Sequence, residues 1–463
     1  MRPVAREARA NRVSAALLFA TLALAPLPFG STDPVVIAVW CIVLGVAVAA
    51  ANPGGLQRGH LALLALAGLL VVLYGVVVAQ QLSSHLFLPG ASPDPLWREA
   101  AEALGLNLPA TVSIARNEPL LSLGAPLAAM LALICGLIVC ADRQRARQLL
   151  TILAWSGVAY AAFGILSFLI DPTKILWRDK RAYLNALTGT FTNRNTAAVY
   201  FGACAIVWLL LLCERANAYL AKLDASGWKQ GVRNLVFAAP RPVVLAFCML
   251  LVCLIALLMT GSRAGIVLSL VVLVMTGVVF LQRRAAHRVG MLGTVAIGAV
   301  MALAVLQFLA VGVGGRFDLQ GFDDEGRLET YRATWRMIMD HPWFGTGLGT
   351  FAWGFPAYRS DGMTLWGVWD RAHNTLLELA ADVGIPLAAA VVIGWLVVLA
   401  VLIRGVRIRR RDFDIPLAAL AVSLLALIHS LVDFSLQIPG FSLVVFALVG
   451  AGLAQSFRSG RRS

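Results

Sequence analysis

Residues 243–281 read VVLAFCMLLVCLIALLMTGSRAGIVLSLVVLVMTGVVFL, and Arg263 is the only charged residue among them. A helix needs around 20 apolar residues to cross the roughly 30 Å hydrocarbon core of a bilayer. The stretch is therefore long enough for two crossings, at 243–260 and 264–281. The connection TGSRAG at 260–265 is short, so the sequence predicts two antiparallel membrane helices joined by a tight turn that contains one arginine.

The whole chain has the same character as this stretch. Of its 463 residues, 60% are hydrophobic and 13% are charged, whereas soluble domains have about 45–50% and about 25%. This composition excludes a soluble enzyme, a disordered chain, a collagen-like chain and a disulfide scaffold. The predicted fold class is an all-α polytopic membrane protein with about 12 transmembrane helices. The expected spans are 13–29, 34–51, 61–79, 120–141, 148–170, 195–213, 243–260, 264–281, 290–312, 374–402, 415–434 and 441–456.

The distribution of charge predicts the orientation of these spans. The chain has a net charge of +14, and its basic residues lie in short runs between apolar segments. This pattern is typical of cytoplasmic loops facing anionic lipid and does not indicate a nucleic-acid partner. With both termini in the cytoplasm, 24 of the 38 basic residues lie inside and 18 of the 24 acidic residues lie outside. We therefore expect both termini to be cytoplasmic.

This orientation leaves three longer segments outside: 80–119, 171–194 and 313–373. The first contains an amphipathic run around residues 97–104, which predicts a short interfacial helix. The third is a long loop between predicted helices 9 and 10, with a helical pattern at 328–339 followed by glycines. Loops of this length are usually functional. Any chemistry is therefore expected on the outer face.

Two outer arginines lie at the membrane boundary. Arg263 is in the turn described above, and Arg194 lies in TFTNRNT at 190–196, at the start of a span. An arginine close to hydrocarbon is costly unless it is paired. Arg263 could extend to the lipid headgroups, or it could bind phosphate through its planar fork of donors. The helix start at Arg194 also attracts anions, so together these arginines suggest a site for a lipid diphosphate.

A histidine lies where the long loop meets the next span. His373 stands in RAHN at 371–374, and Glu378 and Asp382 follow at helical spacing. A neutral imidazole here could remove a proton from a sugar hydroxyl. The alternative is a capping or interfacial histidine. His429 lies within the eleventh predicted span, where a role in helix packing is the simpler interpretation.

Neither a metal site nor a disulfide framework is expected. The seven cysteines lie inside or at the ends of apolar stretches, which is typical of small buried hydrophobic residues. The acidic run of Asp318, Asp323, Asp324 and Glu325 could attract a hard cation, but it fits a solvated loop better. We expect no cofactor.

The motifs form an ordered set that resembles the O-antigen ligase and polymerase superfamily. No single motif is specific, but their order over residues 186–450 is. The motifs are Thr190–Asn195, Gly261–Gly265, Arg327, His341-Pro342, Gly345–Gly349, His373-Asn374, Ser430–Phe434 and Pro439. The resemblance divides the chain into an N-terminal region, 1–185, with helices 1–5 and loop 80–119, and an O-antigen ligase-like region, 186–463, with helices 6–12 and loop 313–373.

Members of this family transfer a glycan from undecaprenyl diphosphate to an acceptor on the periplasmic face, without a metal. The resemblance implies a metal-independent, inverting glycosyltransferase of the bacterial inner membrane, with O-antigen ligation to lipid A core as the favoured activity. It implies that His373 is the base and that Arg194 and Arg263 bind the diphosphate. Arg327, His341 and Asn374 would be secondary contacts. Besides membrane lipids, the implied partners are the lipid-linked donor and an acceptor, which is lipid A core or a growing glycan.

Two alternatives remain open. Polymerisation of an O-antigen or exopolysaccharide, or transfer to protein, requires the same donor chemistry. A transporter of the major-facilitator type also has twelve spans and a larger cytoplasmic loop midway, here residues 214–242. That fold predicts related halves and a substrate site within the membrane, whereas the unusual polar residues of this chain lie at the outer boundary.

Overall fold

The computed structural model describes residues 2–221, 233, 239–285, 325–360 and 369–457. This part of the chain is mostly helical. Its only strands form a two-residue antiparallel hairpin, in which β1 (Lys174–Ile175) pairs with β2 (Arg178–Asp179). An all-α membrane fold satisfies each backbone N–H and C=O within its own helix, as an apolar surrounding requires.

The helices follow the predicted spans closely. They are α1 (Arg2–Leu24), α2 (Pro34–Ala50), α3 (Arg58–Leu82), α4 (Pro95–Leu104), α5 (Glu118–Ser122), α6 (Gly124–Val139), α7 (Arg143–Ile170), α8 (Arg194–Leu220), α10 (Arg241–Met259), α11 (Arg263–Ala285), α13 (Glu325–Asp340), α14 (Phe351–Gly354), α15 (Thr375–Ile408), α16 (Asp414–His429) and α17 (Pro439–Gln455). Short 3₁₀ turns are η1 (Phe29–Ser31), η2 (Phe355–Tyr358) and η3 (Ser435–Gln437).

Seven helical segments are long and apolar enough to cross a membrane: α3, α5 with α6, α7, α8, α10, α11 and α15. The apolar part of α1 and helices α2, α16 and α17 are shorter. Together these helices lie at eleven of the twelve predicted positions, and seven of them have the length and apolar composition to cross a membrane. The ninth predicted span, 290–312, lies outside the described residues, so the number twelve stays a prediction.

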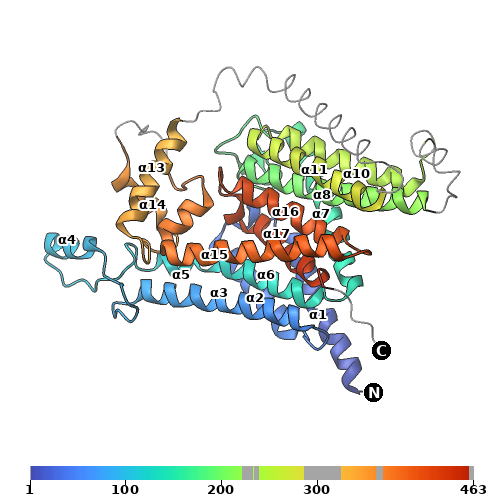
Figure 1. Cartoon of the computed structure of the whole chain (residues 1–463). Helices are drawn as coiled ribbons and strands as arrows, with labels where there is room; N and C mark the ends of the chain where they lie inside the picture. Colours follow the sequence, from blue (N-terminus) through green and yellow to red (C-terminus); the bar gives the residue numbers. More distant parts are fainter. Residues whose placement is uncertain (1, 222–232, 234–238, 286–324, 361–368, 458–463) are drawn as a thin grey trace.

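The helices form one bundle with two distinct ends (Figure 1). Helices α3, α6, α15 and α17 run along the bundle, with α8, α10 and α11 on the side opposite α3. Helices α4, α13 and α14 gather at one end. The helix expected around residues 97–104 is present as α4, and the pattern at 328–339 is present within α13. The start of α1 lies toward the opposite end.

Close helix contacts in the middle of the bundle depend on glycine. A Cβ at Gly136 of α6 would lie 2.6 Å from the carbonyl oxygen of Ala447, and one at Gly450 of α17 would lie 2.3 Å from that of Leu133. Helices α6 and α17 therefore approach backbone to backbone, as small residues allow in membrane bundles. Their contact joins regions 1–185 and 186–463 in one hydrophobic core.

Ion pairs connect three segments at the end of the bundle that lies away from α13. Arg147 of α7 donates to Glu214 of α8 through Nη1 and Nη2, at 2.7 and 2.8 Å. Its Nη2 also lies 2.5 Å from Oδ1 of Asp412, between α15 and α16, and Arg143 Nε lies 2.6 Å from the other oxygen. Bidentate arginine–carboxylate pairs of this kind have a defined geometry. They join α7, α8 and the α15–α16 connection.

The charge distribution and the two ends of the bundle generate a topology prediction. Ser360→Cys, near α13, should react with a membrane-impermeant maleimide from the periplasmic side. Arg411→Cys, an exposed residue after α15, should react only after the inner membrane is opened, because lysine- and arginine-rich segments stay in the cytoplasm. The unsubstituted protein is the control, because its labelling gives the background from the native cysteines. Labelling in the reverse order would place the arginines and His373 in the wrong compartment for the proposed chemistry.

Candidate active site

The starts of α8 and α11 meet next to the segment that follows α16. Oγ of Ser262 donates to Oδ1 of Asn195 at 2.7 Å, and Nδ2 of Asn195 donates to Oδ2 of Asp433. A Cβ at Gly265 would lie 2.6 Å from the Cβ of Ala198, so this glycine permits the close approach of the two helices. Three segments far apart in the sequence are joined here through side-chain hydrogen bonds.

Both predicted diphosphate-binding arginines lie at helix starts in this region. Arg194 and Arg263 are the first residues of α8 and α11. Oδ1 of Asn193 caps α8 by accepting from the N–H of Asn195 at 2.7 Å. The guanidinium of Arg194 lies 5.1 Å from the ring centre of Tyr183. Two arginines and two positive helix ends make the electrostatic environment of this region favourable for an anion.

His373 lies beside the same carboxylate. Its Nδ1 is buried and lies 4.0 Å from Oδ2 of Asp433. The ring packs against Phe434, with centroids 5.3 Å apart. The backbone of His373 has φ of +53°. This left-handed conformation is uncommon for a residue other than glycine, and such outliers cluster at functional sites.

Asp433 carries a charge where it is largely buried. Its Oδ1 accepts from the N–H of Phe434 at 2.7 Å, and its side chain is 2% exposed. Burial raises the pKa of Asp433, but the neighbouring side chains of His373 and His429 and the N–H of Phe434 together hold it below its ordinary value. The carboxylate therefore stays ionised and can orient the His373 imidazole.

Helix α13 supplies the remaining part of the site. Nη1 of Arg327 lies 3.4 Å from the carbonyl oxygen of Val432, next to Asp433. The hydroxyl of Tyr331 donates to the carbonyl oxygen of His373 at 3.1 Å.

Tyr183, from the segment before α8, also lies near these groups. Burial and then the negative charge of Asp433 raise the pKa of Tyr183, while Arg194 and Arg327 oppose this effect. Tyr183 therefore has Arg194, Arg327 and Asp433 as electrostatic neighbours.

The side chain of Asn374 caps the start of α15. Its Oδ1 caps α15 by accepting from the N–H groups of Leu376 and Leu377, both at 3.1 Å, and its Nδ2 donates to the carbonyl oxygen of Leu431 at 3.0 Å. An N-cap of this kind fixes the entry of the chain into a helix. Asn374 thus holds His373 against the segment after α16.

An ion pair between the partly exposed Arg371 and the buried Glu378 fixes the residues before His373. Nη1 of Arg371 lies 3.0 Å from Oε1 of Glu378 and 2.8 Å from Oε1 of Gln437. Oε2 of Glu378 accepts from the N–H of Ala372 at 2.8 Å. The glutamate noted at helical spacing from His373 therefore supports the loop rather than facing the imidazole.

The glycine turn and His341 form a separate group of contacts. Nδ1 of His341 lies 3.7 Å from Oδ2 of Asp94, the residue that caps α4. Gly345, Gly347 and Gly349 all have positive φ, and the N–H of Gly349 donates to Oδ2 of Asp382 at 2.8 Å. The expected turn is present, but the contacts of His341 are directed toward α4 and not toward Asp433.

Several site residues were not singled out from the sequence. Asn195, Ser262 and Asp433 lie within quoted motifs, but their types alone did not show that they meet. The available sign for Asp433 was a carboxylate near the end of the predicted span 415–434. Tyr183 and Tyr331 gave no sign in the sequence.

Within the described residues, no group of three histidine, cysteine, aspartate or glutamate side chains is placed to hold a metal ion. Asp318, Asp323 and Asp324, the acidic residues considered above, lie outside those residues.

The fold and the site define an integral membrane protein with a cationic, histidine-containing site at one end of its helical bundle. Residues 247–392 match a family model described as O-antigen ligase, and this match supports membership of the O-antigen ligase and polymerase superfamily. The matched region contains Arg263, Arg327, His341, His373 and Asn374. It does not reach Arg194 or Asp433. No curated protein matches the chain.

The support of His373 generates a stability prediction. Glu378→Ala should lower the free energy of unfolding by about 2 kcal/mol, because it leaves Arg371 without its carboxylate and Ala372 without its acceptor. Glu329→Ala is the matched control: it removes a surface pair with Arg332, which is worth at most about 1 kcal/mol. Thermal unfolding in nanodiscs would measure both variants. An equal, small effect would show that the Arg371–Glu378 pair does not stabilise the loop.

Proposed function

We propose that this protein transfers a glycan from undecaprenyl diphosphate to an acceptor hydroxyl on the periplasmic face of the bacterial inner membrane. The favoured acceptor is the lipid A core, which makes the protein an O-antigen ligase. The family match supports this class of activity. The observation that carries the proposal is the connection from Ser262 through Asn195 to Asp433, with His373 alongside. It brings the helix starts that bear Arg194 and Arg263 next to a histidine.

The proposed reaction is a single displacement. Nδ1 of His373 lies on the side of Asp433, 4.0 Å from its Oδ2, so we assign Nε2 as the basic nitrogen that takes the proton of the acceptor hydroxyl. The acceptor oxygen forms a bond to the anomeric carbon while the bond from that carbon to the diphosphate oxygen breaks. Undecaprenyl diphosphate leaves, and the anomeric configuration inverts.

The arginines have the electrostatic role in this scheme. Negative charge develops on the diphosphate as the glycosidic bond breaks. Arg194 and Arg263, together with the amides of the two helix starts, stabilise that charge in a site already formed for it. Arg327 on α13 adds a third positive group beside Val432. His341, directed at Asp94, is assigned to organising the outer segment.

Polymerisation is the second candidate, because it uses the same donor and the same family contains both activities. Analysis of glycans in a deletion strain separates the two. Full-length chains remaining on the lipid carrier indicate a ligase, whereas accumulated single repeat units indicate a polymerase. A major-facilitator transporter is not favoured, because the family match at residues 247–392 contains Arg263 and His373.

His373 is the first residue to test. His373→Ala should reduce transfer by about 10² to 10⁴-fold, the usual contribution of a general base. Binding of the lipid-linked donor should change little, because the arginines make those contacts. Asp433→Asn should also slow transfer, because an amide cannot stabilise the imidazolium as the carboxylate does.

The matched control is His85→Ala, an exposed histidine in the 80–119 segment, which should retain full activity. Purified variants assayed for donor binding and turnover separate binding from chemistry. Normal turnover by His373→Ala together with loss of turnover in His341→Ala would show that the assignment of His373 as the base is wrong.

Arg263 tests the donor site. Arg263→Lys keeps the charge but loses the planar fork that binds two phosphate oxygens, so transfer should fall at least about tenfold with normal membrane insertion. Arg194→Ala should cause a similar loss. Arg116→Lys, at an exposed position in the outer segment, is the matched control. If Arg263 only reaches lipid headgroups, lysine should serve as well, and near-normal transfer by Arg263→Lys would contradict the diphosphate role.

Metal independence is the third test of the mechanism. Purified protein should keep its transfer rate in excess EDTA, because the arginines supply the positive charge that a metal ion provides in other enzymes. The rate is measured with and without chelator on the same preparation. A loss of activity that Mg²⁺ or Mn²⁺ restores would contradict this prediction.

A further inference from the structure

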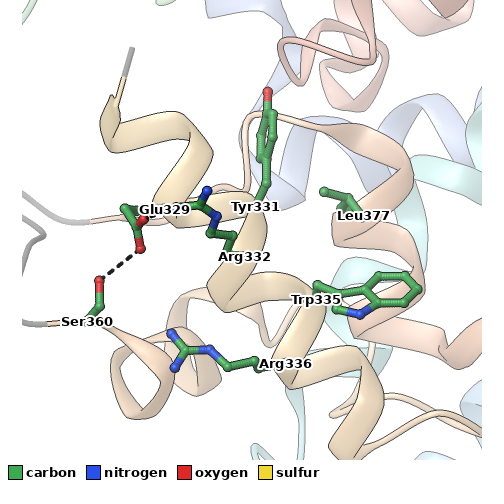
Figure 2. Close-up of a pocket in the computed structure, with 7 residues that line it drawn as sticks. All are labelled: Glu329, Tyr331, Arg332, Trp335, Arg336, Ser360 and Leu377. Atoms are coloured by element: carbon green, nitrogen blue, oxygen red, sulfur yellow. Dashed lines mark hydrogen bonds and ion pairs between the residues drawn. The ribbon is translucent and has the colours of Figure 1, made fainter. Parts of the chain in front are cut away.

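An open cleft lies on the outer side of α13, next to the site described above (Figure 2). Its volume is about 660 Å³. Five of its lining residues come from one face of α13, and two others come from the segment after η2 and from the start of α15. The lining residues are Glu329, Tyr331, Arg332, Trp335, Arg336, Ser360 and Leu377.

Two of the lining residues connect this cleft to His373. The Tyr331 hydroxyl donates to the carbonyl oxygen of His373 at 3.1 Å. The N–H of Leu377 donates to Oδ1 of Asn374, the residue after His373, at 3.1 Å. The cleft is therefore joined, through Tyr331 and Leu377, to the backbone of His373 and to the side chain of Asn374.

The cleft has an aromatic side and a cationic side. The ring of Trp335 lies beside Leu377, and the guanidinium groups of Arg332 and Arg336 lie on the side of Ser360 (Figure 2). Trp335 is 54% exposed, although its ring is among the largest apolar surfaces a side chain can bury. A flat, exposed indole beside polar groups is well suited to packing against the apolar face of a sugar ring.

The two arginines can exchange their present contacts for an anion. Nη1 of Arg332 lies 2.6 Å from Oε1 of Glu329, and the Arg332 side chain is 62% exposed. Exposed ion pairs of this kind contribute little to the free energy of unfolding. Arg336 donates through Nη2 to the carbonyl oxygen of Tyr358 at 3.1 Å and retains further N–H donors. Guanidinium groups bind phosphate and carboxylate with paired hydrogen bonds. Glu329 and Ser360 can bond to sugar hydroxyls.

We propose that this cleft is the acceptor subsite and that it binds a saccharide bearing a phosphate or carboxylate group. The sugar ring packs on Trp335, and the anionic group binds Arg332 and Arg336. The acceptor hydroxyl then extends past Tyr331 toward His373. This assignment rests on the proposed transfer reaction for its role, but binding of the saccharide can be measured without any transfer.

The lining favours a saccharide over a phospholipid. Leu377 is the only aliphatic residue among the seven that line the cleft. The rings of Tyr331 and Trp335 supply flat apolar surface, which suits a sugar ring better than an acyl chain. Its polar groups come from several positions around the opening, as recognition of a polyhydroxylated molecule requires. The charge of the acceptor is then a criterion of selection, because a neutral saccharide leaves both arginines without a ligand.

The direct test is binding to the full-length protein in nanodiscs, in the absence of donor. The probes are pentamannose 6-phosphate, neutral pentamannose, and lipid nanodiscs of the same composition without protein. We expect the phosphorylated probe to bind at least about tenfold more tightly than the neutral one, through charge-assisted hydrogen bonds to arginine. Equal affinity for the two saccharides, or no binding of either at millimolar concentration, would overturn the proposal.

Variants test the named residues. Arg332→Gln with Arg336→Gln should remove the preference for the phosphorylated probe, and Trp335→Ala should weaken binding of both saccharides. Arg98→Gln on α4 and Trp353→Ala on α14 are matched exposed controls outside the cleft and should bind as the unsubstituted protein does. Unchanged preference in the arginine double variant would overturn the assignment, provided its thermal unfolding is normal.

Turnover distinguishes this inference from the proposed function. In transfer assays, the cleft variants should raise KM for an anionic acceptor about tenfold or more, while kcat at saturating acceptor and KM for the donor stay within about twofold. A fall in kcat without a change in acceptor KM would assign the cleft to the chemical step and overturn the subsite. Normal saccharide binding with no transfer in any assay would instead leave the cleft in place and contradict the proposed reaction.

Discussion

The rest of the site depends on how the buried carboxylate of Asp433 is surrounded by its partners. This carboxylate lies almost fully buried just beyond α16, where a single charge would be costly without partners. Asn195, the Phe434 N–H and His373 provide those partners. Because the partners come from α8, from the chain after α16 and from the loop before α15, the need to satisfy one charge determines how these segments meet. The starts of α8 and α11, with their arginines, are placed by the same contacts.

Around this centre, polar residues divide into those that hold the backbone and those available to a substrate. Asn374 accepts from an N–H group in the first turn of α15, and Glu378 and Asp382 accept from the N–H groups of Ala372 and Gly349. In the proposed reaction, His373 and the arginines at the helix starts contact the substrates. The hydrogen bonds of Ala372 and Asn374, on either side of His373, hold the backbone of His373 at its uncommon φ.

The arrangement also separates the two proposed substrates. A diphosphate would meet the helix starts at the membrane boundary, where the lipid tail can stay in the bilayer. An anionic saccharide would approach from the other side of His373, along α13. The reacting groups would then meet at the imidazole, and neither substrate needs to enter the hydrophobic core. A site at the end of the bundle, rather than in its middle, suits a reaction between a lipid-linked donor and a larger acceptor.

The sequence by itself determined the membrane class, the position of most helices and their expected orientation, because apolar length and charge distribution act locally and need no knowledge of neighbours. It also identified Arg194, Arg263 and His373 as unusual, since a charged or titratable group beside hydrocarbon is conspicuous in one dimension. Tertiary structure decided which of these residues meet. It joined Asp433 to Asn195 across 238 positions, placed His341 against Asp94, and gave Glu378 a supporting role. Such pairings depend on how glycine-lined helices approach one another, and no local pattern in the sequence records that geometry.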